Sequence, residues 1–229
     1  MDETLQMTTS HRTAEPRATQ ARPSIAQRML RDSAYTLTAL PIGILTFTTA
    51  VVGISAGVGL FVIWVGLPVL VGTVLLARTF AHLERLRLRS LQDRAAPLPS
   101  YLKAAPESSV LRRLFTPLRD PQSWLDTVWG IVGFITGLIA FVVTIAWWSA
   151  ALGGLTYWFW EQWLPQDDTT LAELIGFGEG RTPEIWLNLG IGAFALLTLP
   201  MMVRAVAALH GGTASAMLDG RATLRSETA

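Results

Sequence analysis

A run of 45 residues without a charged side chain, between Asp32 and Arg78, constrains the fold of this chain more than any other feature. A helix needs about 20 apolar residues to cross the ~30 Å hydrocarbon core of a bilayer, so this run is long enough for two crossings. Further uncharged runs cover residues 127–160 and 185–203. The sequence therefore predicts an all-α membrane protein with four transmembrane helices.

The second half of the chain repeats the first. A shift of 94 residues aligns Gly43 with Gly137, and a shift of 126 residues aligns Arg78 with Arg204. The difference of 32 residues is an insertion between the two helices of the second copy. Because each copy has two spans, both copies enter the membrane from the same side. We therefore predict two parallel hairpin repeats, related by a pseudo-twofold axis along the membrane normal.

The predicted boundaries follow from glycine, proline and charge. We expect a turn at residues 55–59, where small residues allow a tight bend. Residues 1–27 and 221–229 are predicted to be cytoplasmic tails, the first of them disordered. Residues 155–184 form the outer insertion. The membrane domain is expected over residues 28–220, with spans at 34–55, 58–79, 126–150 and 185–207.

Basic residues set the expected orientation. Of the 18 Lys and Arg residues, 17 lie in the N-terminal tail, the central loop or the C-terminal region, and only Arg181 lies in the insertion. Cytoplasmic loops carry such an excess of cations. We therefore expect a multi-pass protein of the cell membrane with both termini in the cytoplasm. The insertion, with six acidic residues against Arg181, faces outward.

Two basic amphipathic stretches flank the central loop, at residues 78–93 and 110–119. Alternating leucine and arginine predict helices that lie at the membrane surface and contact anionic lipid. The alternative is a docking surface for a cytoplasmic partner. The candidate lipid or partner contacts are Arg78, Arg85, Arg87, Arg89, Arg112, Arg113 and Arg204.

The insertion begins with five aromatic residues within ten positions, followed by carboxylates. One interpretation is an aromatic belt at the membrane interface, where Trp and Tyr are enriched. The other is a ligand site, because indole faces with nearby carboxylates suit a cationic amphiphile. The candidate ligand-binding residues are Trp158, Trp160, Glu161, Trp163, Asp167 and Asp168.

Several kinds of chemistry have no support in the sequence. The chain has no cysteine, which excludes disulfides and thiolate metal sites. Its three histidines lack metal-ligand spacing, and His210 is expected to be a plain interfacial residue. No nucleotide-binding or hydrolase motif occurs. We therefore expect no catalytic residue, no metal, no cofactor and no nucleic-acid partner.

Five short motifs occur in a fixed order: LPIG at 40–43, GLP at 66–68, ARTFAHLER at 77–85, LRDPQSW at 118–124 and PMMVRAVAALH at 200–210. Their order and spacing resemble the sensor domain that precedes the kinase core in many actinobacterial two-component histidine kinases. The resemblance covers about residues 28–220 and implies signal input. The kinase core has no counterpart in this sequence, so the resemblance implies a stand-alone chain.

Together these observations predict a non-enzymatic integral membrane sensor or accessory protein. It would receive an extracytoplasmic or in-membrane signal and pass it to a separate chain. That partner would be a histidine kinase, another membrane protein or a second copy of this chain. The alternative is a membrane subunit of a transporter complex.

Overall fold

The computed structural model describes residues 24–92, 101–105, 107–164 and 170–219, and the regular elements in this part of the chain are all helices. Four of them are long and apolar enough to cross a membrane, which confirms the all-α fold with four membrane-length helices. They are α1 (Ile25–Gly59), α2 (Gly66–Gln92), α4 (Pro121–Leu155) and α7 (Arg181–Leu218).

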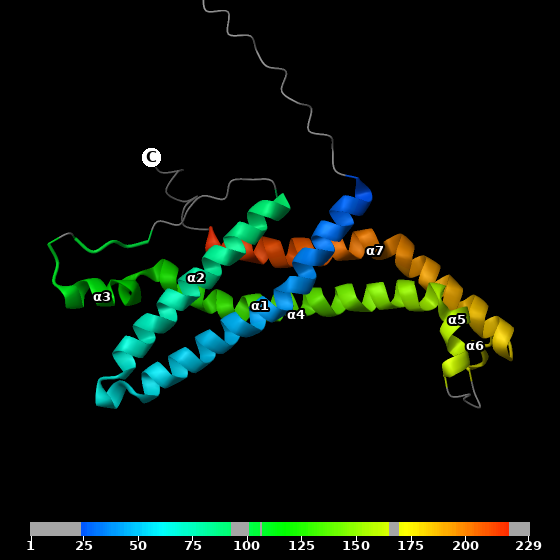
Figure 1. Ribbon diagram of the computed structural model, residues 1–229, viewed down its shortest axis with the longest axis horizontal. Coiled ribbons are helices and arrows are strands. Elements are labelled where there is room, and N and C mark those ends of the chain that lie inside the picture. The colour runs from blue at the N-terminus through cyan, green and yellow to red at the C-terminus, as the bar shows by residue number, and fades with distance from the viewer. Residues whose placement is uncertain (1–23, 93–100, 106, 165–169, 220–229) are drawn as a thin grey trace, which may run out of the picture.

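Shorter elements connect these helices. One single turn, η1 (Phe61–Ile63), lies between α1 and α2, and α3 (Val110–Arg119) precedes α4. The segment between α4 and α7 contains α5 (Tyr157–Trp160), η2 (Glu161–Trp163) and α6 (Leu171–Leu174). Figure 1 shows α4 and α7 side by side along most of their length, with the α1–α2 hairpin lying obliquely across them.

Polar caps extend the long helices beyond the predicted spans. Ser24 and Gln27 form a capping box, so α1 begins at Ile25 rather than near residue 34. The last residues of the predicted tail, 25–27, are therefore helical, whereas residues 1–23 and 220–229 lie outside the described part of the chain. Asp120 caps α4, which opens with Pro121 at a position where proline fits the first helical turn.

The turn of the first hairpin is not at residues 55–59, as predicted, but at residues 60–65. The α1 helix continues through Gly57 because this glycine serves close helix packing rather than a bend. A Cβ atom on Gly57 would lie 2.4 Å from Cγ of Leu70 on α2. The chain reverses instead at Trp64, whose φ of 64° is left-handed.

The α1 and α4 helices cross in an antiparallel sense. A Cβ atom on Gly137 would lie 3.3 Å from the Ala39 Cβ, and one on Gly130 would lie 3.0 Å from the Thr46 carbonyl oxygen. Residue numbers rise on α1 where they fall on α4 at this oblique crossing, and the parallel arrangement of the two hairpin repeats stays a prediction. Small residues allow close contact in either sense, so the sequence repeat does not fix the direction of packing.

Alanine is frequent in the buried core of the bundle, and many large apolar side chains lie on its outside. Ala81, Ala140 and Ala151 are fully buried, whereas Leu197 is 81% exposed. Large apolar side chains are costly in contact with water but not with lipid tails. This distribution therefore fits helices that pack closely within a bilayer.

Candidate functional site

Arg85 of α2 lies at the centre of a buried ion-pair cluster. Its side chain is 1% exposed, and one terminal nitrogen donates to Asp126 Oδ1 at 2.9 Å and to the Leu218 carbonyl oxygen at 3.1 Å. The Gln122 amide also donates to Asp126, at 3.1 Å. Three helices, α2, α4 and the end of α7, are thus joined through one guanidinium. We call this the Arg85 cluster.

Glu84, the preceding residue, forms a second buried cluster on a neighbouring face of α2, about 100° around the helix. The Tyr35 hydroxyl donates to Glu84 Oε1 at 2.7 Å, and Arg87 forms an ion pair with the same carboxylate. Arg87 also donates to the Tyr35 carbonyl oxygen at 2.7 Å and to Thr38 at 2.8 Å. This Glu84 cluster fastens α2 to the first third of α1.

His210 brings α7 into the Glu84 cluster. Its ring is 2% exposed and lies 5.5 Å, centroid to centroid, from both Tyr35 and Trp129. Nδ1 is 2.8 Å from the Thr136 hydroxyl, and Nε2 is 3.6 Å from Glu84 Oε1. The expectation that His210 is a plain interfacial residue is therefore wrong: the imidazole is buried beside a carboxylate.

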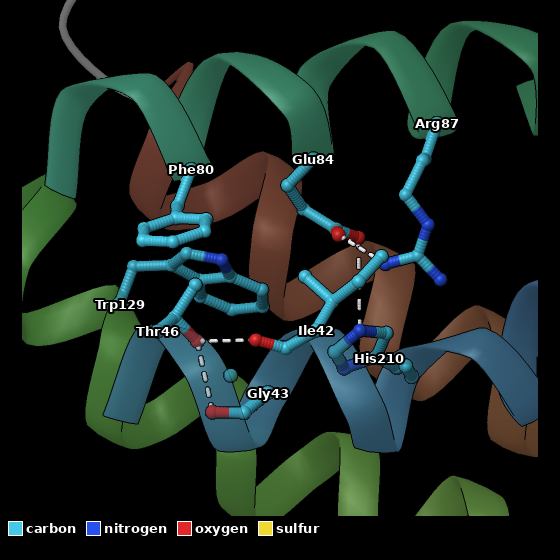
Figure 2. A pocket seen from close by; sticks show the side chains of 10 residues that line it. Ile42, Gly43, Thr46, Phe80, Glu84, Arg87, Trp129 and His210 are labelled. Carbon is cyan, nitrogen blue, oxygen red and sulfur yellow. Dashed lines mark hydrogen bonds and ion pairs between the residues drawn. The ribbon is translucent and has the colours of Figure 1, made fainter. Parts of the chain in front are cut away.

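A small pocket opens beside this cluster (Figure 2). Glu84, Arg87 and His210 line it together with Trp129 and Thr46. The space left for the centre of a water molecule is about 10 Å³, close to the minimum for one water. His210 Nε2 has no hydrogen-bond partner within the described residues. The pocket can therefore hold a water or proton between a carboxylate and an imidazole, but not an organic ligand.

Arg78 forms a third polar contact, about two helical turns before Arg85 on α2. Its Nε donates to Ser123 at 2.7 Å, and a terminal nitrogen pairs with Asp120 at 2.8 Å. The guanidinium also lies 4.3 Å from the centre of the Tyr101 ring. Because Asp120 caps α4, Arg78 fixes the start of that helix against α2.

Tyr101 connects the Arg78 contact to the Arg85 cluster. Its hydroxyl donates to Asp126 Oδ2 at 2.6 Å and accepts from Arg85 at 3.1 Å. Burial, followed by the hydrogen bond and charge of Asp126, raises the pKa of Tyr101 to about 12. The phenol therefore stays protonated, and remains a donor, well above neutral pH.

Tyr101→Phe is expected to lower the unfolding free energy by about 1–3 kcal/mol, since it removes a hydrogen bond to a carboxylate. The raised pKa means that the hydroxyl contributes fully below pH ~10 and loses its contribution as pH rises through about 12. Thermal unfolding at pH 7, 9 and 11 measures this. Tyr157→Phe is the control, because the Tyr157 hydroxyl has no hydrogen-bond partner among the described residues. Equal stability of Tyr101→Phe and wild type at pH 7 would show that the hydrogen bond from Tyr101 to Asp126 does not stabilise the fold.

The structure separates the arginines that we grouped as lipid or partner contacts. Arg85 is buried in the protein, which corrects the expectation of lipid contact at this residue. Arg78 and Arg87 form internal ion pairs, with side chains 17% and 18% exposed. Arg89 is half-buried; Arg112, Arg113 and Arg204 are exposed, so contact with lipid or a partner stays a prediction for them.

The candidate ligand-binding residues between α4 and α7 also differ in their exposure and contacts. Trp158 and Trp163 are 61% and 66% exposed, whereas the Trp160 indole donates to the Gly153 carbonyl oxygen at 3.1 Å. Glu161 forms an ion pair with Arg181. Asp167 and Asp168 lie outside the described residues. A ligand site at this end stays a prediction, centred on the two exposed indoles.

Sequence reasoning missed Glu84, Tyr101 and His210. Our predicted second span ended at residue 79, so Glu84 was assigned to a surface helix. A signal was present for Glu84, because it recurs with Ala77, Ala81 and Leu88 at the 3–4 residue spacing of one helix face. Within the described residues, no three His, Asp or Glu side chains are placed to hold a metal ion.

The comparisons with known proteins gave one finding. A family model with the description "Putative sensor" matches residues 35–218, which include α1 from Tyr35, α2, α4 and α7. No curated protein and no solved structure matches the chain.

Proposed function

Because this chain belongs to the sensor family whose model matches residues 35–218, we propose that it is a non-enzymatic integral membrane sensor that passes its signal to a separate partner chain. The four membrane-length helices and the lipid-facing distribution of large apolar side chains support a multi-pass membrane location. The 17-to-1 distribution of basic residues supports a cell-membrane protein with both termini in the cytoplasm.

The observation that carries the proposal is the pair of buried clusters on α2. Glu84 contacts α1 and α7, and Arg85 contacts α4 and the end of α7. Separating a buried charge from its partner costs several kcal/mol, so these helix ends do not drift past one another gradually. A change in one helix instead moves the clusters between discrete arrangements, as signal transmission requires.

Input reaches the clusters through α4 and α7. The outer segment connects the end of α4 to the start of α7, and Arg181 at that start pairs with Glu161. Asp126 lies on α4 and His210 lies on α7, so a ligand that displaces the outer segment acts on both helices that hold the clusters. The exposed indoles of Trp158 and Trp163 are the contacts we assign to that ligand, a cationic amphiphile.

Output is assigned to the exposed cytoplasmic ends. Arg112 and Arg113 on α3 offer a basic surface, and Ser90 is exposed near the end of α2. A histidine kinase, another membrane protein or a second copy of this chain are the partners that fit a sensor. The protein itself supplies no reaction in this proposal.

The absence of native cysteine allows a direct test. A fluorophore on Ser90→Cys reports on the end of α2 in the full-length protein in lipid nanodiscs. We expect dodecyltrimethylammonium, below its micelle concentration, to change the fluorescence. Trp158→Ala/Trp163→Ala should abolish the change, and Glu84→Gln should reduce it without altering amphiphile binding.

Dodecyl maltoside, with the same alkyl chain but no charge, is the control. An equal response to both amphiphiles, or an unchanged response in the tryptophan variant, contradicts reception at the outer segment. Energised transport of the amphiphile by the protein with an ATPase partner would favour the transporter alternative.

A further inference from the structure

The two ring nitrogens of His210 have different surroundings. Nδ1 lies 2.8 Å from the Thr136 hydroxyl, and this hydroxyl donates to the Val132 carbonyl oxygen at 3.0 Å. A hydroxyl has one hydrogen to donate, so Thr136 accepts from His210, and Nδ1 carries the hydrogen of the neutral ring. Nε2 of the neutral imidazole is therefore an unprotonated acceptor.

The unprotonated nitrogen faces a second acceptor, as Figure 2 shows for His210 and Glu84. Glu84 Oε1 lies 3.6 Å from Nε2 and already accepts from the Tyr35 hydroxyl at 2.7 Å. Nε2 itself has no hydrogen-bond partner within the described residues. Two buried acceptors that face each other without a hydrogen between them are unfavourable. One hydrogen added to Nε2 converts this nitrogen into a donor to Glu84.

The charges around the ring leave His210 as the group that can gain a proton. The titratable groups that face it are Tyr35 on α1 and Glu84 and Arg87 on α2. Glu84 and Arg87 form an ion pair, and the Tyr35 hydroxyl is protonated because it donates to Glu84. The described side chains of α4 that contact the ring, a threonine and a tryptophan, carry no charge.

We propose that His210 Nε2 and Glu84 form a proton-binding site through which this chain responds to pH. A proton from water adds to the Nε2 lone pair and makes the ring a cation, and it returns to water when the pH rises. Nε2–H then donates to Glu84 Oε1, so the two atoms approach from 3.6 Å to about 2.8 Å. Because Glu84 lies on α2 and His210 on α7, proton binding draws these helices together.

This inference rests on the proposed function, since it adds a second input to the clusters that we assign to signal transmission. Glu84 also holds Tyr35 of α1, so a shift of its carboxylate toward His210 reaches three helices. Arg87 lines the pocket and its side chain is 18% exposed, which places the entry of the proton on this side. The outer segment is not part of the proton site, so the two inputs can fail separately.

Nitrogen NMR of the full-length protein in nanodiscs measures the proton directly. His11→Gln/His82→Gln leaves His210 as the single histidine of the chain, so isotopically labelled histidine reports on this ring alone. We expect a neutral ring with its hydrogen on Nδ1 at about pH 8, and hydrogen on both nitrogens at about pH 5. A ring that stays neutral at both pH values overturns the site, and a water that donates to Nε2 and Glu84 then fills the pocket.

A pH-insensitive fluorophore on Ser90→Cys, without amphiphile, tests whether the proton acts on the end of α2. We expect the fluorescence to change between about pH 8 and about pH 5, and His210→Gln to abolish the change. The matched control is His82→Gln, which removes an exposed histidine from α2 and should keep the change. Equal responses of the two variants overturn the proposal. An intact pH response without an amphiphile response contradicts the outer ligand site and supports the proton site.

Discussion

Asp126→Ala is expected to lower the unfolding free energy by about 3–5 kcal/mol, because it leaves Arg85 buried without its carboxylate. The Arg85 and Asp126 side chains are 1% and 0% exposed, so water cannot replace the lost partner without opening the bundle. Unfolding of the detergent-solubilised protein measures the loss. Arg181→Ala is the comparison: that side chain is 70% exposed, and its ion pair is worth at most about 1 kcal/mol.

A double variant keeps this prediction distinct from general damage to the fold. Arg85→Met/Asp126→Leu removes both charges and replaces them by apolar groups of similar size, a change that is often neutral for buried pairs. It should recover most of the stability lost in Asp126→Ala. If the single variant is as stable as the wild type, Arg85 is not buried and paired as described.

Gly154→Ala should strongly disrupt the contact between α4 and α7. A Cβ atom there would lie 2.6 Å from the Asn188 carbonyl oxygen and 2.7 Å from the Gly192 backbone. Backbone atoms cannot move aside as side chains do, so the helices must separate and lose their close packing. We expect the free energy of unfolding to fall by several kcal/mol, comparable to the effect of overpacking in other protein cores. Size-exclusion chromatography should show this as a large fall in the yield of folded protein.

The adjacent residue provides the control for this substitution. A Cβ atom on Gly153 would meet only Trp160, at 3.9 Å, which is an ordinary contact. Gly153→Ala should therefore express and fold like the wild type. Equal yields for the two variants would mean that α4 and α7 do not touch at Gly154.

The four long helices could be predicted because length and hydropathy alone decide whether a helix can cross a bilayer. Their ends could not. Gly57 lies in the predicted turn at residues 55–59, yet it and Gly154 both lie inside helices, where a partner helix needs the space of the missing side chain. Only the packed structure distinguishes these two uses of glycine.

The buried clusters were missed for a related reason. Arginine and glutamate beyond a predicted span indicate a solvated surface when only the sequence is considered. Arg85 is buried because Asp126 and Leu218, 41 and 133 residues away in the chain, meet it in the fold. The contacts of Tyr35 with Glu84 on α2 and with His210 on α7 have no sequence signal either.

Disulfide cross-linking in native membranes tests the central claim that α1 crosses α4 in an antiparallel sense, beside the Glu84 cluster of α1, α2 and α7. Ala39→Cys/Gly137→Cys and Ala50→Cys/Gly130→Cys place Cβ atoms about 3.3 and 3.2 Å apart, close to disulfide geometry. Both pairs should cross-link rapidly, whereas the exchanged pairs, Ala39→Cys/Gly130→Cys and Ala50→Cys/Gly137→Cys, should not. Cross-linking of the exchanged pairs instead would contradict the antiparallel crossing of α1 and α4.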